Sequence, residues 1–267
     1  MRGVCLAVIL TSATAVANEP ISIAMDRGDD GVRADASLTI IPASAFALRA
    51  DAYVQYVDPR FHAGGYVAMP FTFEHPDYGY PSSSWFGNLE LGALYVAHVL
   101  PQLRVVARVG IVLPTYNDPT SISGDVLRLT DWVDNDSDAT TLRFAVSPIY
   151  RNGVVFTRVD IGFDRGPTPE RLPEATSFVR VNAAVGVAVE RVAFSVESVN
   201  LYATNGPFIG NGTLPARGAS WRDEVVLGGQ YQIGVATPYF AFVLPADHDM
   251  RQSFDAALTI GCDVRLR

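Results

Sequence analysis

Three acidic residues at alternate positions, Asp134, Asp136 and Asp138, are the clearest candidates for binding an ion. Oxygen ligands at this spacing form the first half of a calcium-binding loop. Such a loop also needs a glycine where this chain has Ala139, and a glutamate at its twelfth position, which is absent here. The sequence therefore favours a solvated acidic loop, and a loosely held divalent ion is the alternative.

The run Asp247, His248 and Asp249, together with His75, could in principle activate a water molecule, because carboxylates orient imidazole bases. Both stretches fall in predicted loops, and no serine has a base at a recognisable spacing. Outside residues 1–17 the chain has a single cysteine, Cys262, so neither an internal disulfide nor a thiolate metal site is expected. We predict no catalysis and no cofactor, and a hydrolase at the rim of the fold remains a minor alternative.

A larger set of charged residues falls on every second position of segments that are otherwise apolar. We call positions that alternate in this way, and so share one face of a segment, positions of one parity. All cations in the chain are arginine, whose planar guanidinium pairs bidentately with carboxylates. In a confined polar interior, this set would form either a salt-bridge network that braces a wall or a filter that tunes transport, and the network is favoured. The set comprises Arg33, Asp35, Arg49, Asp51, Glu90, Arg104, Arg108, Arg143, Arg158, Asp160, Arg180, Glu190, Glu197, Arg222, Glu224, Asp255, Asp263 and Arg265.

The segments that must position these charges follow a two-residue rhythm. In 103–113 every odd position is apolar, whereas Arg104 and Arg108 fall on even positions. Strict alternation indicates a strand with one apolar and one wet face. A soluble sheet buries the apolar face, whereas a membrane barrel turns it toward lipid. The predicted strands are 32–41, 45–57, 61–72, 87–98, 103–114, 141–150, 154–163, 177–189, 193–203, 222–232, 235–244 and 253–266.

The connections between these strands alternate in length. The short turns 58–60 and 100–102 are followed by the long loops 73–86 and 115–140, respectively. Outer-membrane barrels show this order because their periplasmic turns are tight and their extracellular loops are long. The sequence therefore predicts an all-β fold, a single antiparallel up-and-down transmembrane barrel of about twelve strands. A secreted soluble sandwich is the alternative, favoured by the poor alternation of 193–203, where Glu197 shares parity with Val199 and Leu201.

The domain organisation predicted from the sequence has three parts. Residues 1–17 combine Arg2, an apolar run and the small-residue motif ending at Ala17, which is typical of a cleaved export signal. An N-terminal segment, 18–31, precedes the barrel at 32–267. The net charge of −8 argues against nucleic acid as a partner. Outer-membrane lipid and a small-molecule solute are the expected partners, and the oligomeric state is left open.

Two stretches carry a resemblance to a known family. The run from Tyr56 to Pro70 resembles that family's strand, tight turn and strand ending in proline. Residues 87–95 and 109–115 are similar to its glycine-led strand and to its strand ending in Leu-Pro-Thr, with Asn88 in place of the usual aspartate. The family is the outer-membrane barrel family linked to the MetA pathway of phenol degradation, also described as transporters. The resemblance implies an outer-membrane barrel that passes small, often hydrophobic or aromatic compounds.

These observations predict a channel or transporter for small solutes in the cell outer membrane. The alternative is a non-conducting barrel whose loops bind at the cell surface or serve a structural role. The two differ in whether the lumen conducts, which the sequence does not determine.

Overall fold

The structure is a computed structural model, and it describes residues 30–41, 46–75, 82–115, 140–166, 177–204, 221–247, 251 and 254–266. The predicted signal at 1–17, the acidic loop with Asp134, Asp136 and Asp138, and the pair His248 and Asp249 lie outside the described residues. No helix in the described part of the chain is long and apolar enough to cross a membrane.

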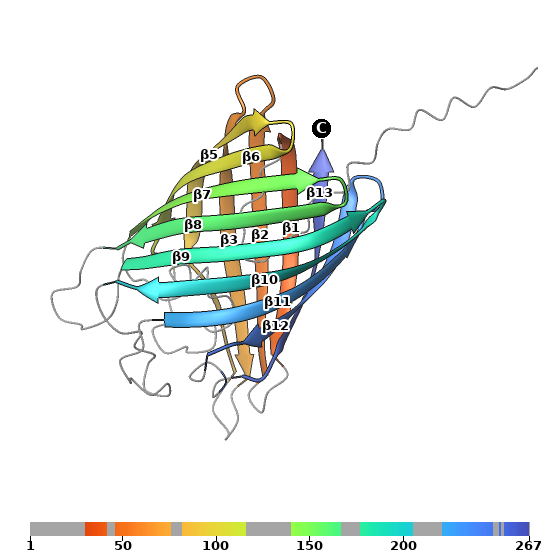
Figure 1. Cartoon of the computed structure of the whole chain (residues 1–267). Helices are drawn as coiled ribbons and strands as arrows, with labels where there is room; N and C mark the ends of the chain where they lie inside the picture. The colour runs from red at the N-terminus through yellow and green to blue at the C-terminus, as the bar shows by residue number, and fades with distance from the viewer. Residues whose placement is uncertain are drawn as a thin grey trace, which may run out of the picture.

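The described residues form strands that follow one another along the chain (Figure 1). Each segment is rich in β-branched and aromatic residues that alternate with polar ones, which suits a pleated strand with two different faces. The strands are β1 (Gly31–Ile41), β2 (Phe46–Asp58), β3 (Ala63–His75), β4 (Ser83–Phe86), β5 (Leu89–Leu100), β6 (Leu103–Leu113), β7 (Thr141–Asn152), β8 (Val155–Arg165), β9 (Ser177–Val189), β10 (Val192–Ala203), β11 (Trp221–Tyr231), β12 (Ala236–Pro245) and β13 (Ala257–Leu266).

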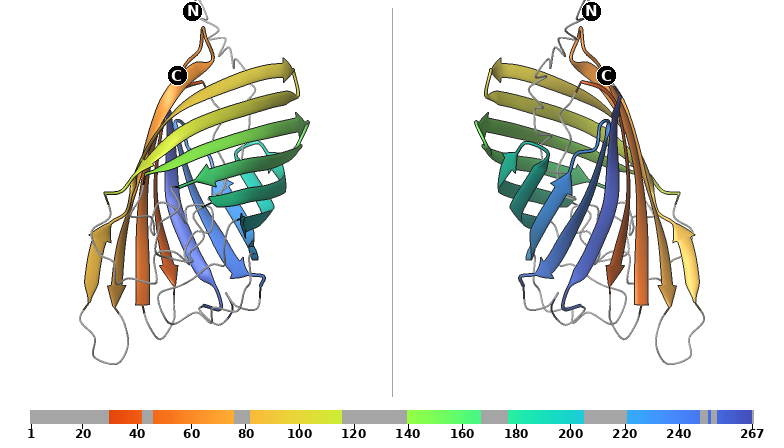
Figure 2. Two further views of the ribbon diagram at one scale, coloured as in Figure 1. Left: turned by 90° about the vertical axis from the view of Figure 1, so that its left-hand side faces the viewer. Right: turned by 90° about the vertical axis from the view of Figure 1, so that its right-hand side faces the viewer.

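The strands close into a twelve-stranded antiparallel barrel, as the sequence predicts. β4 and β5 share one position in the ring because both pair with β3, at Phe71–Phe86 and at Val67–Leu91 respectively. β1 pairs with β2 on one side and with β13 on the other, and this second pairing closes the ring. Figure 2 shows that β13 ends at the same rim as the tight turn between β2 and β3. We call this rim the turn end and the opposite rim the loop end.

The outer face of the barrel is apolar and exposed. On β9 the residues Val181, Val185 and Val187 point outward and are each at least 40% exposed. The alternation that places them there also turns their neighbours Arg180, Asn182 and Gly186 toward the lumen. Similar outward side chains occur around the ring: Val54, Leu91, Val109, Phe144, Val146, Ile161, Phe194, Leu227, Phe240, Phe242 and Ile260.

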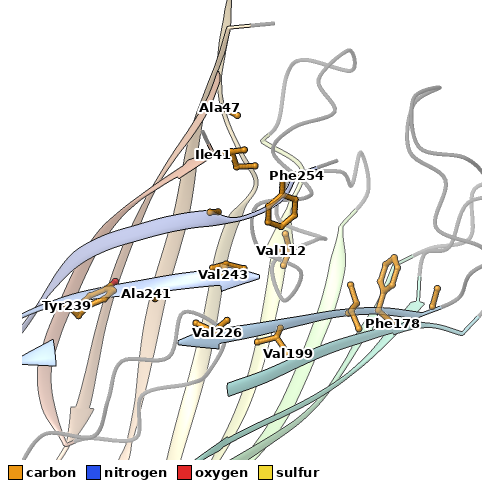
Figure 3. Close-up of a cluster of buried hydrophobic side chains, with 13 residues drawn as sticks. Ile41, Ala47, Val112, Phe178, Val199, Val226, Tyr239, Ala241, Val243 and Phe254 are labelled. Carbon is orange, nitrogen blue, oxygen red and sulfur yellow. The ribbon is translucent and has the colours of Figure 1, made fainter. Parts of the chain in front are cut away.

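The inward side chains are buried, and they are not uniformly polar. At the loop end, an apolar cluster includes Ile41, Val112, Phe178, Val243 and Phe254, and Figure 3 shows Phe254 between Ile41 and Val112. Toward the turn end, a second cluster comprises Val57, Tyr66, Leu94, Val96, Val106 and Ile149. The apolar inward residues explain why 193–203 alternates poorly: Glu197, Val199 and Leu201 all face the lumen and are all buried.

Three sequence-based assignments are wrong in detail. β13 begins at Ala257 and not at 253, so Asp255 is an exposed bend residue ahead of the strand, and Phe254 is buried rather than outward. Glu190 lies on the tight turn between β9 and β10, exposed and with a φ of 51°. The conformation of this turn, and not strand parity, determines where the Glu190 side chain points.

Closure of the ring can be tested with a disulfide, because Cys262 on β13 lies directly opposite Ala36 on β1. Cross-strand Cα atoms in antiparallel sheets lie about 4.5–5.5 Å apart, within the range that a disulfide spans. We expect Ala36→Cys to form a bond to Cys262 on oxidation, visible as a linked peptide by mass spectrometry. Ala107→Cys on β6 is the matched control and should form none. Failure of residues 36 and 262 to link in the folded protein would contradict closure.

Candidate functional site

The candidate site is the charged wall of the lumen, and strand parity brings it together. On β8 the inward positions carry Arg158, Asp160 and Asp164, all buried, while Val159 and Ile161 point outward. The same rule turns the charges of the neighbouring strands into the lumen. Because several kcal/mol are lost when a buried ion has no partner, these residues must meet opposite charges there.

A continuous charge network crosses five neighbouring strands, and its members are Glu90, Arg108, Arg143, Asp160, Asp164 and Arg180. At its centre the Arg143 guanidinium lies between two carboxylates. Arg143 Nη1 donates to Glu90 Oε2 at 2.5 Å, and Nε donates to Asp164 Oδ1 at 3.2 Å. Arg180 binds the same Asp164 through Nη2 at 3.2 Å. All four of these side chains are at most 3% exposed, so the ion pairs are well shielded from water.

Asp160 links this network to neutral polar groups. Its Oδ1 accepts a hydrogen bond from the Ser147 hydroxyl at 2.6 Å, and Oδ2 accepts one from the Asn182 amide at 3.4 Å. Arg180 Nη1 lies 3.7 Å from the same carboxylate. Asp160 therefore has hydrogen-bond partners on both neighbouring strands, and Arg180 on β9 supplies the opposite charge.

Glycines create the space in which these long side chains lie flat against the wall. A Cβ at Gly110 would come within 2.4 Å of the Tyr66 hydroxyl and 3.0 Å of Glu90 Oε1. The absent side chain on β6 therefore allows Glu90 on β5 to meet Arg143 on β7. Gly162 has the same role beside Arg180, whose Nη2 would lie 2.5 Å from a Cβ at that position.

Tyr66 on β3 extends the network by one strand. Its hydroxyl donates a short hydrogen bond to Glu90 Oε1, and its ring stacks on Tyr53 with 5.8 Å between centroids. The Arg108 guanidinium lies 5.6 Å from the centre of the Tyr66 ring and 3.8 Å from Glu90 Oε1. Arg108 is thus held by a cation–π contact and by a looser ion pair.

A second group of charges lies where the ring closes. Arg33 on β1 donates to Asp263 on β13 at 2.5 Å, and Arg265 donates to the other oxygen of Asp263 at 2.7 Å. The Tyr239 hydroxyl donates to Asp35 at 3.1 Å. On β2, Arg49 and Asp51 pair at 2.7 Å. Ion pairs therefore reinforce the pairing between the first and last strands.

Four arginines near the turn end form a distinct cationic group. Arg104 on β6 is close enough to Arg151, Arg158 and Arg265 for their positive charges to repel its own. Arg104, Arg151 and Arg265 are only partly buried, in contrast to Arg143 and Arg180 of the charge network. We call these four residues the turn-end arginine group. Because Arg265 belongs to β13 and Arg104 to β6, the group faces the lumen from separate parts of the wall.

The other lumen residues predicted from the sequence lie outside these groups of charges. Arg222 lies 3.8 Å from Asp247, Glu197 accepts a hydrogen bond from Ser195 at 3.2 Å, and Glu224 is buried on β11. Sequence reasoning missed Asp164, Arg151 and Tyr66. Asp164 shares the parity of Arg158 and Asp160, which could have revealed it, but the predicted strand ended at residue 163. Arg151 falls in the predicted turn 151–153. Tyr66 carries no charge, so a search for charged residues does not find it.

Several solved structures that resemble this chain are outer-membrane channels and porins. The COG4313 outer membrane channel from Pseudomonas putida F1 superposes with a TM-score of 0.70 over 91% of this chain and 100% of the other, at 9% identity. The NanC porin superposes with a TM-score of 0.56 over 88% of this chain and 100% of the porin, at 11% identity. The KdgM porin superposes with a TM-score of 0.55 over 88% of this chain and 99% of the porin, at 7% identity. At these identities the likeness shows a shared fold.

Comparisons by sequence give no match, either to a family model or to a curated protein. The resemblance of residues 56–70 and 87–115 to the MetA-pathway family therefore remains a hypothesis. The structural likeness supports the coarser part of it, an outer-membrane type of twelve-stranded barrel.

The two arginines beside Glu90 should differ in their importance for stability. Arg143→Leu removes the main cation of Glu90 and one of the two arginines that bind Asp164, and losing one partner of a buried pair costs about 3–5 kcal/mol. Arg108→Leu removes a 3.8 Å pair and a cation–π contact, so its cost should be clearly smaller. Urea unfolding of the protein in detergent or lipid, followed by tryptophan fluorescence, measures both. Equal stability of the two variants would contradict the network as described.

Proposed function

We propose that the protein is an outer-membrane channel for small solutes, exported by the signal at 1–17. The observation that carries this proposal is the combination of a closed ring, an apolar exposed outer face and a charged inner face. A soluble barrel would gain nothing from a belt of exposed valine and phenylalanine, because exposed apolar surface on this scale favours association. In a bilayer the same belt contacts lipid, and ring closure leaves no unpaired strand edge.

The lumen favours small solutes because its wall is densely occupied. Arg49, Arg143 and Arg180 are among the largest inward side chains, and each is about 1% exposed. Their guanidinium groups lie along the wall in fixed ion pairs rather than in open water. A pathway beside such a wall is narrow, or requires part of the lumen to rearrange, so large molecules would be excluded.

The charge of the wall favours anions. On the inward parity of the strands, the described arginines outnumber the described carboxylates, although the whole chain has a net charge of −8. The excess is concentrated in the turn-end arginine group, where Arg104, Arg151 and Arg265 are partly accessible. Small organic acids, aromatic ones included, are therefore the proposed solutes. The KdgM porin, which shares this fold, has been solved in complex with disordered oligogalacturonate, a polyanion, and this supports anions as the proposed solutes.

A non-conducting barrel is the second candidate function. It is favoured by one observation, the apolar cluster around Phe254, Ile41 and Val112 at the loop end of the lumen. An apolar layer across a lumen opposes the passage of ions by dewetting. If that layer is permanent, binding at the cell surface would replace transport as the proposed function.

Insertion into a bilayer can be tested at the outer face. Ile161 lies at mid-strand on β8 and points outward, and Val155 points outward at the turn end of the same strand. Arginine at the bilayer midplane costs about 2–4 kcal/mol, and near the interface about 0–1 kcal/mol. We expect Ile161→Arg to reduce folding into lipid vesicles far more than Val155→Arg, as measured by heat-modifiable gel migration. Equal effects of the two substitutions would oppose a transmembrane orientation.

Conduction and its charge preference can be measured with the purified protein in planar bilayers. We expect single-channel currents and a reversal potential that indicates anion preference in a salt gradient. Arg104→Gln combined with Arg158→Gln should shift the reversal potential toward cations, because it removes two charges of the turn-end arginine group.

The control for this experiment is Arg191→Gln, which removes an exposed arginine on the turn between β9 and β10. It should leave the reversal potential unchanged. A correctly inserted protein that passes no current would reject the channel and favour the surface-binding barrel. A conducting protein with unchanged selectivity in the double variant would reject the proposed role of the arginine group while retaining the channel.

A further inference from the structure

Three potential metal ligands from separate parts of the chain meet at the turn end. Asp30 directly precedes β1, His62 lies in the turn between β2 and β3, and His98 lies near the end of β5. Their ligand atoms all lie within 4.8 Å of one another. The chain has only four histidines, so this convergence uses half of them. None of the three belongs to the lumen wall network described above.

The distances suit a small divalent cation. His62 Nδ1 lies 3.0 Å from Asp30 Oδ2, and His98 Nε2 lies 3.7 Å from the same oxygen. In a tetrahedral zinc site with bonds near 2.0 Å, neighbouring ligand atoms are about 3.3 Å apart. The two observed separations fall on either side of this value. The imidazole rings are themselves in contact, with 4.6 Å between their centroids.

The backbone fixes His62 in place before any ion binds. The His62 N–H donates to the Asp58 carbonyl at 2.7 Å, and the His62 carbonyl accepts from the Val96 N–H at 2.7 Å. Its φ of 52° is unusual for a residue other than glycine, and the turn and β5 together hold it there. A ligand with a fixed backbone loses little conformational entropy on binding.

The other two ligands are placed by local irregularities. Gly31, with a φ of 93°, follows Asp30 and directs the chain into β1, a conformation that other residues rarely adopt. The pairing of β5 with β6 shifts register between His98 and Leu100, next to the tight turn that joins the two strands. A register shift re-aims neighbouring side chains, and His98 here points toward His62 and Asp30. The three side chains are partly exposed, so an ion could reach them from solvent.

We propose that Asp30, His62 and His98 form a binding site for a divalent transition-metal ion at the turn end of the barrel. Two imidazoles and one carboxylate favour zinc and its neighbours in the first transition row over calcium or magnesium, which prefer oxygen ligands. Three protein ligands leave at least one position for water. The ion would join the start of β1, the β2–β3 turn and the end of β5. The proposal rests on the fold alone and does not depend on conduction.

The test uses full-length mature protein without a polyhistidine tag, refolded in detergent and stripped with a chelator. Zinc binding is measured by isothermal titration calorimetry, and the thermal unfolding midpoint is measured with and without zinc. We expect one zinc ion per chain and a higher midpoint in its presence. Calcium and magnesium at the same concentration should give neither effect.

Two variants and one control locate the site. Asp30→Asn and His98→Gln each remove one ligand with little change in size, and each should weaken zinc binding by about tenfold or more, since even changes to groups that only orient ligands cost 10–100-fold. His248→Gln removes a histidine outside the proposed site and should bind zinc normally. Heat-modifiable migration without metal confirms that each variant is folded.

The possible results separate the proposal from its alternatives. Loss of binding in both ligand variants, with normal binding in the control, supports the site. Absence of saturable zinc binding in the wild-type protein overturns it and leaves Asp30 and His62 as a hydrogen-bonded pair. Wild-type affinity in folded Asp30→Asn and His98→Gln proteins also overturns it, because the zinc would then bind elsewhere.

Discussion

Each buried arginine in this barrel needs a carboxylate partner, and this requirement determines how the interior is built. Arg143 on β7 meets Asp164 on the adjacent strand directly, but it meets Glu90 on β5 only because Gly110 leaves the intervening strand β6 without a side chain. A wall of ordinary side chains would separate charges two strands apart. The network therefore depends as much on the glycines as on the ions, and together they set how much of the lumen is filled.

The barrel could be predicted from the sequence because alternation and loop length are local signals. Residues 103–113 show the period directly, and the short and long connections indicate the order of the strands. The exact ends of strands were harder to predict, as Asp255 and Phe254 show, because parity was extended past the point where pairing stops. The β4–β5 interruption at Gly87 and Asn88 likewise reflects pairing with β3, which no local pattern reveals.

The candidate site was predictable only as a set of charges on one parity. Which arginine meets which carboxylate depends on the register between strands, and the sequence does not contain that register. Apolar residues within the lumen, such as Val199 and Leu201, obscure the alternation that indicates a barrel strand, although they belong to an apolar layer at one end of the barrel. The sequence does not reveal the cluster of Asp30, His62 and His98, because these residues come together only through a turn, a glycine and a shift of strand register.

The ion pair between Arg33 and Asp263 joins residues 230 positions apart in the sequence, and it lies in the last pairing needed to close the ring. Contacts of such long range slow folding, because the entropy of bringing the ends together is lost before the contacts form. Until β13 arrives, β1 and β12 each present an unpaired edge that can recruit another chain. While the protein folds, aggregation through these open edges therefore competes with closure of the ring. The competition ends only when β13, the last ten-residue strand, pairs with β1 and β12.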